Sequence, residues 1–338
     1  MVVIGIDPHK SSHTAAAVDD HAQLLAEVRL PAHRTVVKRL REWASCFPER
    51  IWAVEGANGL GRLLAQELVA AGEQVVDVPS KLATRARLLQ TGHGRKTDRV
   101  DACSVAVAAL YSRHLRPVAA EDHSTLLRLL ADRRDELNEE RRRATNRLHR
   151  LLRDLVAGGA PRELTQTTAS AILRKCRPVS VVDLERKAMA RHLIADLRRL
   201  DRALNQNRLR CAQAVALTNT SLIQIPGISE VLAAKIIGHT GDPSRFPSAA
   251  HYGSYTGTAP IEASSGDLKR HRLSRAGNRS LNYALHMAAR SQLNRPGAGR
   301  AYYDRKLAEP SDASSANWPM LSSDTFFRTA IIPCGTWA

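Results

Sequence analysis

The sequence places four carboxylates at positions that a layered α/β fold would bring close together. The apolar runs VVIGID (residues 2–7) and IWAVEG (residues 51–56) are typical of buried strands, and they bring Asp7 and Glu55 to strand ends. Asp98 and Asp101 lie three residues apart in the helix-forming segment TDRVDACSVAVAAL and therefore share one helix face. Converging carboxylates bind divalent cations, Mg²⁺ or Mn²⁺, and support phosphoryl transfer. Because a single such acid is more often a solvated or capping group, this prediction depends on their joint placement.

A second group of reactive residues follows much later in the chain. Ser265 precedes Gly266 and a basic run, and its hydroxyl becomes a nucleophile for phosphate where cations or a metal site favour its deprotonation. Local sequence alone favours a Ser-Ser-Gly surface turn over a nucleophile, and Ser264 would take the role of Ser265 if the register moved by one residue. The cations predicted to contact nucleic acid are Lys96, Arg141, Arg142, Arg143, Lys269, Arg270, Arg272 and Arg275.

Alternating strands and helices must position the four acids. This alternation predicts an α/β layered domain with a central sheet, in which ligands gather beyond the carboxyl ends of the strands. Asp7 and Glu55 lie at those ends. The predicted strands are residues 2–7, 13–19, 51–56 and 74–79, and the predicted helices are residues 35–43, 59–72 and 97–110.

The middle of the chain is helical and strongly basic. Over residues 124–156, apolar residues recur at seven-residue intervals, and a second stretch with alternating spacings of three and four follows a Gly-Gly-x-Pro break. The pattern predicts either a coiled-coil arm or a simple helical hairpin packed on its own domain. Residues 222–242 then predict a helix-hairpin-helix, whose turn would offer backbone N–H groups to phosphate, or an ordinary helix connection.

Composition indicates a nucleic-acid-binding protein. Lys and Arg number 50 against 33 Asp and Glu, for a net charge of +17, and cations paired with phosphate release condensed counterions. The alternatives are a merely basic soluble protein or one that binds anionic membranes. No stretch approaches the roughly 18 apolar residues of a membrane span, so we expect a cytoplasmic protein with no membrane partner. Its five scattered cysteines are expected to be reduced thiols.

The ordered motifs GID, VEG, KTDRVDA, IPGI, YTGTAP, SG and LSRAGNRSLNYAL resemble a DEDD transposase of the insertion-sequence-one-ten family, over residues 1 to about 307. The resemblance implies a RuvC-like, ribonuclease-H-type domain whose acidic tetrad is Asp7, Glu55, Asp98 and Asp101. It also implies a C-terminal transposase domain with Ser265 as the nucleophile. Such enzymes cleave and rejoin DNA through a covalent phosphoserine. They recognise donor and target DNA through a structured bridge RNA and assemble as dimers that pair into tetramers.

Four segments follow from these patterns. We expect a RuvC-like catalytic domain over residues 1–118, a coiled-coil arm over 119–215 and a mainly α-helical transposase domain over 216–307. Residues 308–338 form an atypical tail with four aromatic side chains, in which Arg328 is the only Lys or Arg. Our hypothesis is that this tail is frame-shifted or replaced, which leaves the activity of this copy open. The hypothesis is wrong if no other reading frame of the coding DNA encodes a basic helix.

Two other functions compete with the recombinase. A metal-dependent junction-resolving nuclease would use the same four acids with water as the nucleophile, and would leave Ser265 idle. An inactive relic would bind nucleic acid without strand transfer. An actin-like kinase shares a strand ending in GID, but the sequence contains no convincing phosphate-binding loop and its basic charge argues against that class.

Overall fold

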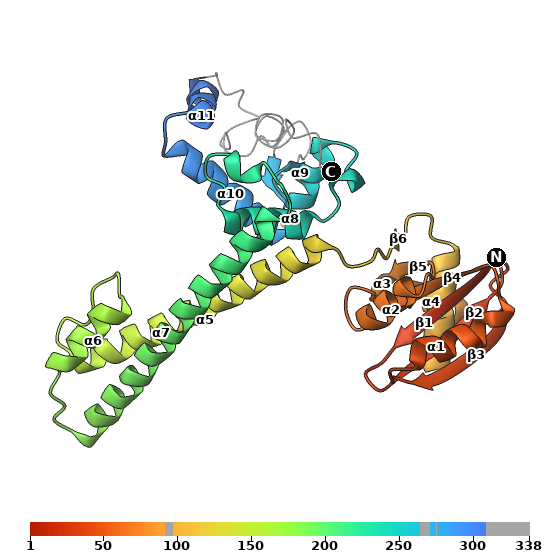
Figure 1. The fold of residues 1–338 in the computed structure, drawn as a ribbon, viewed down its shortest axis with the longest axis horizontal. Helices are drawn as coiled ribbons and strands as arrows, with labels where there is room; N and C mark the ends of the chain where they lie inside the picture. The colour runs from red at the N-terminus through yellow and green to blue at the C-terminus, as the bar shows by residue number, and fades with distance from the viewer. Residues whose placement is uncertain (92–96, 264–270, 275, 309–338) are drawn as a thin grey trace. The chain divides into compact units, whose positions relative to one another are not determined.

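The chain forms two compact units in the computed structural model, Met1–Glu121 and a second unit from Asp122 onward. The structure describes residues 1–91, 97–263, 271–274 and 276–308 (Figure 1). The predicted atypical tail therefore lies, from residue 309, outside the described residues. Within the described part, no helix has the length and apolar character needed to cross a membrane.

The first unit is built on one mixed sheet. Strands β1 (Val2–Pro8), β2 (Ser12–Val18), β3 (Leu24–Pro31), β4 (Arg50–Glu55), β5 (Val75–Val78) and β6 (Arg116–Pro117) lie in the order β3-β2-β1-β4-β5-β6. Strand β1 runs antiparallel to β2 and parallel to β4, and β4 runs parallel to β5. This order, with its antiparallel β1-β2-β3 half, fits the ribonuclease-H-type domain that the resemblance implies.

Helices cover both faces of this sheet. Ile4 and Ile6 belong to a buried cluster with α1 (Val36–Trp43) and α2 (Arg62–Ala70) on one face. Val3 and Ala53 belong to a second cluster with α3 (Ser80–Thr91) and α4 (Asp98–Leu110) on the other face. Central strands that are apolar on both faces need such covering layers, which explains why β1 and β4 read as continuous apolar runs.

Glu73 ties the start of β4 to the rest of the first unit. Its carboxylate accepts hydrogen bonds from Arg50 (2.7 and 3.0 Å), from the Trp52 indole (2.8 Å) and from Arg41 (2.9 Å). Burial alone would raise the pKa of Glu73, but these hydrogen bonds outweigh it and lower the pKa to about 2. The network therefore holds β4 most firmly while Glu73 is ionised.

Two long helices run alongside each other in the second unit. Helix α5 (His123–Leu155) packs against α7 (Val181–Ala216), and α6 (Gln166–Lys175) joins the same buried cluster (Figure 1). The residues at seven-residue intervals are buried, as expected for the contact face of such a pair. They are Leu130, Leu137, Ala144 and Leu151. Helix α5 thus lies near its predicted bounds of 124–156 and a second long helix follows it, whereas coiled-coil packing stays a prediction.

The remaining helices form a second core at one end of that pair. Helices α8 (Glu230–Thr240), α9 (Ala249–Thr256) and α10 (Arg279–Leu293) pack there, and α11 (Ala298–Ala308) follows. Gly238 of α8 lies against the α5 backbone, where an added Cβ would overlap Arg128. Buried Lys235 extends from α8 to Asp135 of α5 at 2.6 Å. These contacts fix α8 across the start of α5.

The segment before the IPGI turn is shorter than predicted. A 3-10 helix of three residues, Leu222–Gln224, precedes the turn, and α8 begins three residues after Gly227. Gly227 has a φ of 89°, which favours glycine at this position. The second predicted helix is therefore present, whereas the helix-hairpin-helix motif and its role in phosphate binding stay predictions.

We predict that Glu73→Gln lowers the free energy of unfolding by roughly 3 kcal/mol at neutral pH, since each pKa unit corresponds to about 1.4 kcal/mol. The carboxylate has a depressed pKa in the folded state, so its contribution is complete above about pH 5 and declines as pH falls toward 2. Denaturant unfolding between pH 7 and 3 measures this. The exposed Glu49→Gln is the control, and equal effects of both substitutions would contradict the assigned network.

Candidate active site

Two of the four predicted acids lie at adjacent strand ends. Asp7 is the penultimate residue of β1 and Glu55 is the last residue of β4. Because these strands are parallel and Ile6 pairs with Val54, the two acids follow that pair at the same edge of the sheet. Asp7 is buried and Glu55 is half-buried. The sheet therefore positions both acids as the apolar runs predicted.

The other two acids lie in the first turn of α4. Thr97 caps this helix, since its hydroxyl accepts a hydrogen bond from the Val100 N–H at 3.3 Å. Asp98 begins the helix and Asp101 is buried one turn later. Acids are favourable at this end, because the first N–H groups of a helix carry partial positive charge.

A glycine lets α4 approach the sheet closely enough to bring both pairs together. A Cβ on Gly5 would overlap the carbonyl oxygen of Ala102 and the amide nitrogen of Ala106. Both of these are α4 backbone atoms, so neither can rotate away. The helix therefore rests directly on β1, with its first turn near the carboxyl end of that strand, where Asp7 lies.

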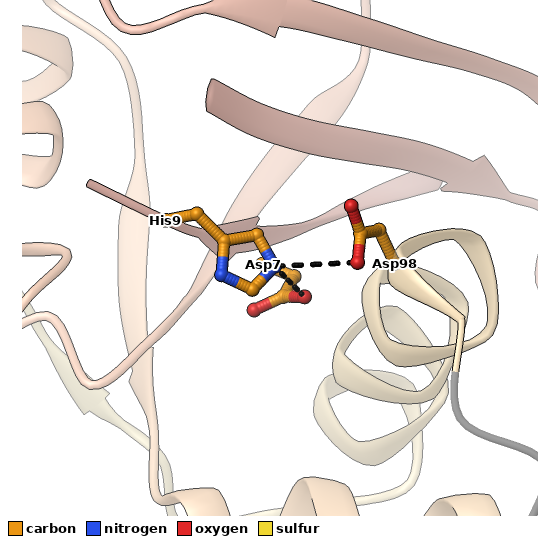
Figure 2. Close-up of side chains that lie close together, drawn as sticks. All are labelled: Asp7, His9 and Asp98. Atoms are coloured by element: carbon orange, nitrogen blue, oxygen red, sulfur yellow. Dashed lines mark ion pairs between the residues drawn. The ribbon is translucent and has the colours of Figure 1, made fainter. Parts of the chain in front are cut away.

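His9 completes the cluster and was not predicted. Its Nε2 atom lies 3.1 Å from Oδ2 of Asp7 and 3.5 Å from Oδ1 of Asp98 (Figure 2). Among the described residues, Asp7, His9 and Asp98 form the one group whose ligand atoms all lie within 4.8 Å of one another, as a metal site requires. The signal in the sequence is slight, because a histidine two residues after a strand-end acid is ordinary in a turn.

Arginines balance the acids on α4, and sequence patterns did not indicate them either. Arg29 of β3 lies 3.1 Å from Oδ2 of Asp98, and Arg87 of α3 lies 2.6 Å from Oδ1 of Asp101. The sheet register aligns Asp7 with Thr14 and Thr14 with Arg29, so the three residues form a row on the α4 face. Asp98 thus lies between Asp7 and a cation from the third strand.

The three other predicted acids all affect the pKa of Asp7. Burial raises the pKa of Asp7 above its ordinary value, His9 opposes this, and the carboxylates of Glu55, Asp101 and Asp98 raise the pKa further. Carboxylates act on one another in this way only at short range in a protein. The arrangement therefore concentrates negative charge that a bound cation would relieve.

Asp77 stabilises the turn after β4 and is not one of the four predicted acids. Its carboxylate accepts hydrogen bonds from the Ala57 N–H and the Asn58 amide, both at 2.8 Å. The chain turns sharply after Glu55, where Gly56 has a φ of 58°. Asp77 of β5 therefore holds the turn that follows Glu55 and fixes the direction of that strand end.

The other predicted site residues divide into two groups. Arg141, Arg142 and Arg143 lie on α5, where the first contacts Asp201 at 2.7 Å and the others contact Glu139 at 2.7 and 3.6 Å. Arg272 is exposed on β8 (His271–Leu273). The remaining predicted site residues lie outside the described residues: Ser264, Ser265, Lys96, Lys269, Arg270 and Arg275.

Comparison with known proteins identifies the family. A transposase model matches residues 4–156, and a model of the IS116/IS110/IS902 family transposases matches residues 219–304. The insertion element IS116 uncharacterized 44.8 kDa protein of Streptomyces clavuligerus is 30% identical over an alignment that covers 90% of this chain and 88% of that protein. The chain therefore belongs to the IS116/IS110/IS902 family of transposases.

Two more distant similarities cover most of the chain and about a third of it, respectively. The transposase for insertion sequence element IS1328 of Yersinia enterocolitica is 24% identical, over 91% of this chain and 88% of that protein. Among solved structures, T. thermophilus RuvC in complex with Holliday junction substrate is 22% identical, with a TM-score of 0.29. That similarity covers 35% of this chain and 99% of the RuvC chain.

We predict that Gly5→Ala lowers the free energy of unfolding by about 2 kcal/mol, because the new methyl group forces α4 away from β1. The same shift moves Asp98 and Asp101 from Asp7, so Mn²⁺ affinity falls as well. Denaturant unfolding and a Mn²⁺ titration measure the two effects. Gly59→Ala is the matched control, because its added methyl meets only ordinary contact at 3.5 Å. Equal stability of the two variants would contradict this packing.

Proposed function

We propose that this protein is an RNA-guided DNA recombinase that cleaves and rejoins strands through a phosphoserine, with divalent cations at the acidic cluster. The observation that carries the proposal is the convergence of Asp7, Asp98 and His9 within 4.8 Å, with Glu55 and Asp101 close enough to raise the pKa of Asp7. Membership of a transposase family supports DNA as the substrate.

The described residues fit a divalent cation. Asp7 and Asp98 offer carboxylate oxygens in reach of a common ion, and Glu55 and Asp101 add negative charge around it. Mg²⁺ or Mn²⁺ held there would neutralise the phosphate and the charge that develops during its displacement. Arg29 and Arg87 hold Asp98 and Asp101 in place from the sides, so the acids stay oriented when no phosphate is present.

Ser265 is the proposed nucleophile. Its hydroxyl oxygen would attack a DNA phosphodiester, form a phosphoserine ester and release one hydroxyl end of the DNA. Attack by another DNA hydroxyl would then break the ester and restore the serine, so no external energy is consumed. Support comes from the family match over residues 219–304, which includes this position.

Two sets of contacts join the described residues that flank the Ser265 segment. Strand β7 (Pro260–Glu262) pairs antiparallel with β8, so Glu262 lies opposite His271. At the base, Gly257 and Gly277 lie so close that a Cβ on Gly277 would overlap the Gly257 backbone. The strand pairing and the close glycine packing thus both join the described residues on either side of Ser265.

Nucleic-acid partners are proposed from charge and from the family. A net charge of +17 favours binding of donor and target DNA and of a structured guide RNA. We assign the acidic chemistry to residues 1–118, an antiparallel coiled-coil arm to residues 119–215, and the serine chemistry with a helix-hairpin-helix to residues 216–307. In this proposal, dimers formed through the arm assemble into tetramers.

Ser265→Ala is predicted to lower formation of a covalent protein–DNA product by roughly a thousandfold or more, because no other group replaces the nucleophile. Labelled DNA that migrates with denatured full-length protein measures this product. Ser264→Ala should retain it, and Asp7→Asn should abolish strand cleavage. If Ser265→Ala cleaves normally while Asp7→Asn does not, water is the nucleophile and the junction-resolving nuclease replaces the recombinase.

RNA that copurifies with the full-length protein is predicted to include a structured species that matches the DNA flanking the gene. Base pairing by such an RNA, and not by protein side chains, would then select the DNA sites. Sequencing the bound RNA against total cellular RNA measures the enrichment. No enrichment of the flanking sequence would contradict RNA guidance. Enrichment without strand transfer at any Mg²⁺ concentration would instead indicate the inactive relic.

A further inference from the structure

His9 lies beside Asp7 and Asp98, although it is not one of the four predicted acids. It belongs to the turn between β1 and β2, where its backbone N–H donates to the Ser12 carbonyl at 2.9 Å. This hydrogen bond fixes the backbone of His9, which follows Asp7 by two positions. Its imidazole then extends across the gap between β1 and the first turn of α4 (Figure 2).

Two buried polar atoms at this place have no hydrogen-bond partner in the described residues. One is Nε2 of His9, although it lies 3.1 and 3.5 Å from carboxylate oxygens of Asp7 and Asp98. The other is Oγ1 of Thr14, a residue 5% exposed whose register partner is Asp7, on the same sheet face. Buried polar atoms rarely stay unsatisfied, so a ligand with several polar partners is expected here.

The spacing of the three ligand atoms suits one ion. Neighbouring ligands of an octahedral ion, each about 2.1 Å from it, lie roughly 3 Å apart. The Nε2 atom of His9 lies close to that separation from both carboxylates. A simple ion pair would instead direct one N–H toward one oxygen, and neither contact meets the geometry of a hydrogen bond.

We propose that His9 is a nitrogen ligand of the metal site, together with Asp7 and Asp98, and that it selects transition-metal ions such as Mn²⁺ over Mg²⁺. Mg²⁺ takes oxygen ligands and keeps its waters, whereas imidazole is a ligand of transition metals. An imidazole in the cluster therefore contributes more to Mn²⁺ affinity than to Mg²⁺ affinity. This inference rests on the proposed function, because it concerns the same acidic cluster.

The experiment compares metal affinities of full-length protein and its variants. Loss of the free Mn²⁺ electron paramagnetic resonance signal reports Mn²⁺ binding, and competition by Mg²⁺ gives the second affinity. His9→Ala should weaken Mn²⁺ binding by roughly tenfold or more and Mg²⁺ binding by less than about threefold. His21→Ala, a substitution of an exposed histidine in the same unit, should change neither.

A spectroscopic readout keeps the inference testable even where a variant is unstable. Electron spin echo spectra of Mn²⁺ bound to wild-type protein should contain imidazole nitrogen coupling, and His9→Ala should lack it. Absence of that coupling in wild-type protein, or Mn²⁺ and Mg²⁺ affinities that rise in His9→Ala, would overturn the inference and make His9 an internal counter-ion. The acidic cluster itself fails only if wild-type protein binds neither metal, or if Asp7→Asn binds both unchanged.

Discussion

The contact between α4 and β1 is the constraint on which the candidate active site depends. Two neighbouring parallel strands are enough to place Asp7 and Glu55 close together. Asp98 and Asp101, in contrast, belong to a helix that follows both strands in the sequence. They reach Asp7 because Gly5 removes the side chain that would separate helix and strand. Ala102 and Ala106 continue this close packing on α4, so small residues on both elements set the distance between the acids.

Crowding of like charges has a cost, and the fold limits it from several directions. Arg29 and Arg87 pair with the two helix acids, and the start of α4 adds the partial positive charge of its N–H groups. Among the described residues, Asp7 forms an ion pair with His9 and with no arginine, and its pKa is raised by burial and by its acidic neighbours. The arginines thus compensate the two helix acids and not Asp7, where a bound cation would relieve repulsion.

Much of this arrangement could be predicted because it is local in the sequence. Apolar runs ending in Asp7 and Glu55 indicated strand ends, and the spacing of Asp98 and Asp101 indicated one helix face. Strand β3 is absent from the predicted elements, since most of its residues are half-buried or exposed and its apolar signal is weak. Arg29, Arg87 and His9 could not be assigned, because their relation to the acids arises from cross-strand register and from helix packing.

In the second unit, arginines that the sequence predicts to contact nucleic acid form ion pairs with carboxylates of the same unit. Arg141 and Arg142, predicted to contact nucleic acid, each contact a carboxylate of the same unit at 2.7 Å. Exposed ion pairs of this kind contribute little to stability, so a phosphate backbone can compete for these arginines. The pairing orders these side chains along α5, and their role as phosphate contacts stays a prediction. Nucleic-acid affinity would then depend on the net charge of +17 more than on any one arginine, which is the behaviour expected of sequence-independent backbone binding.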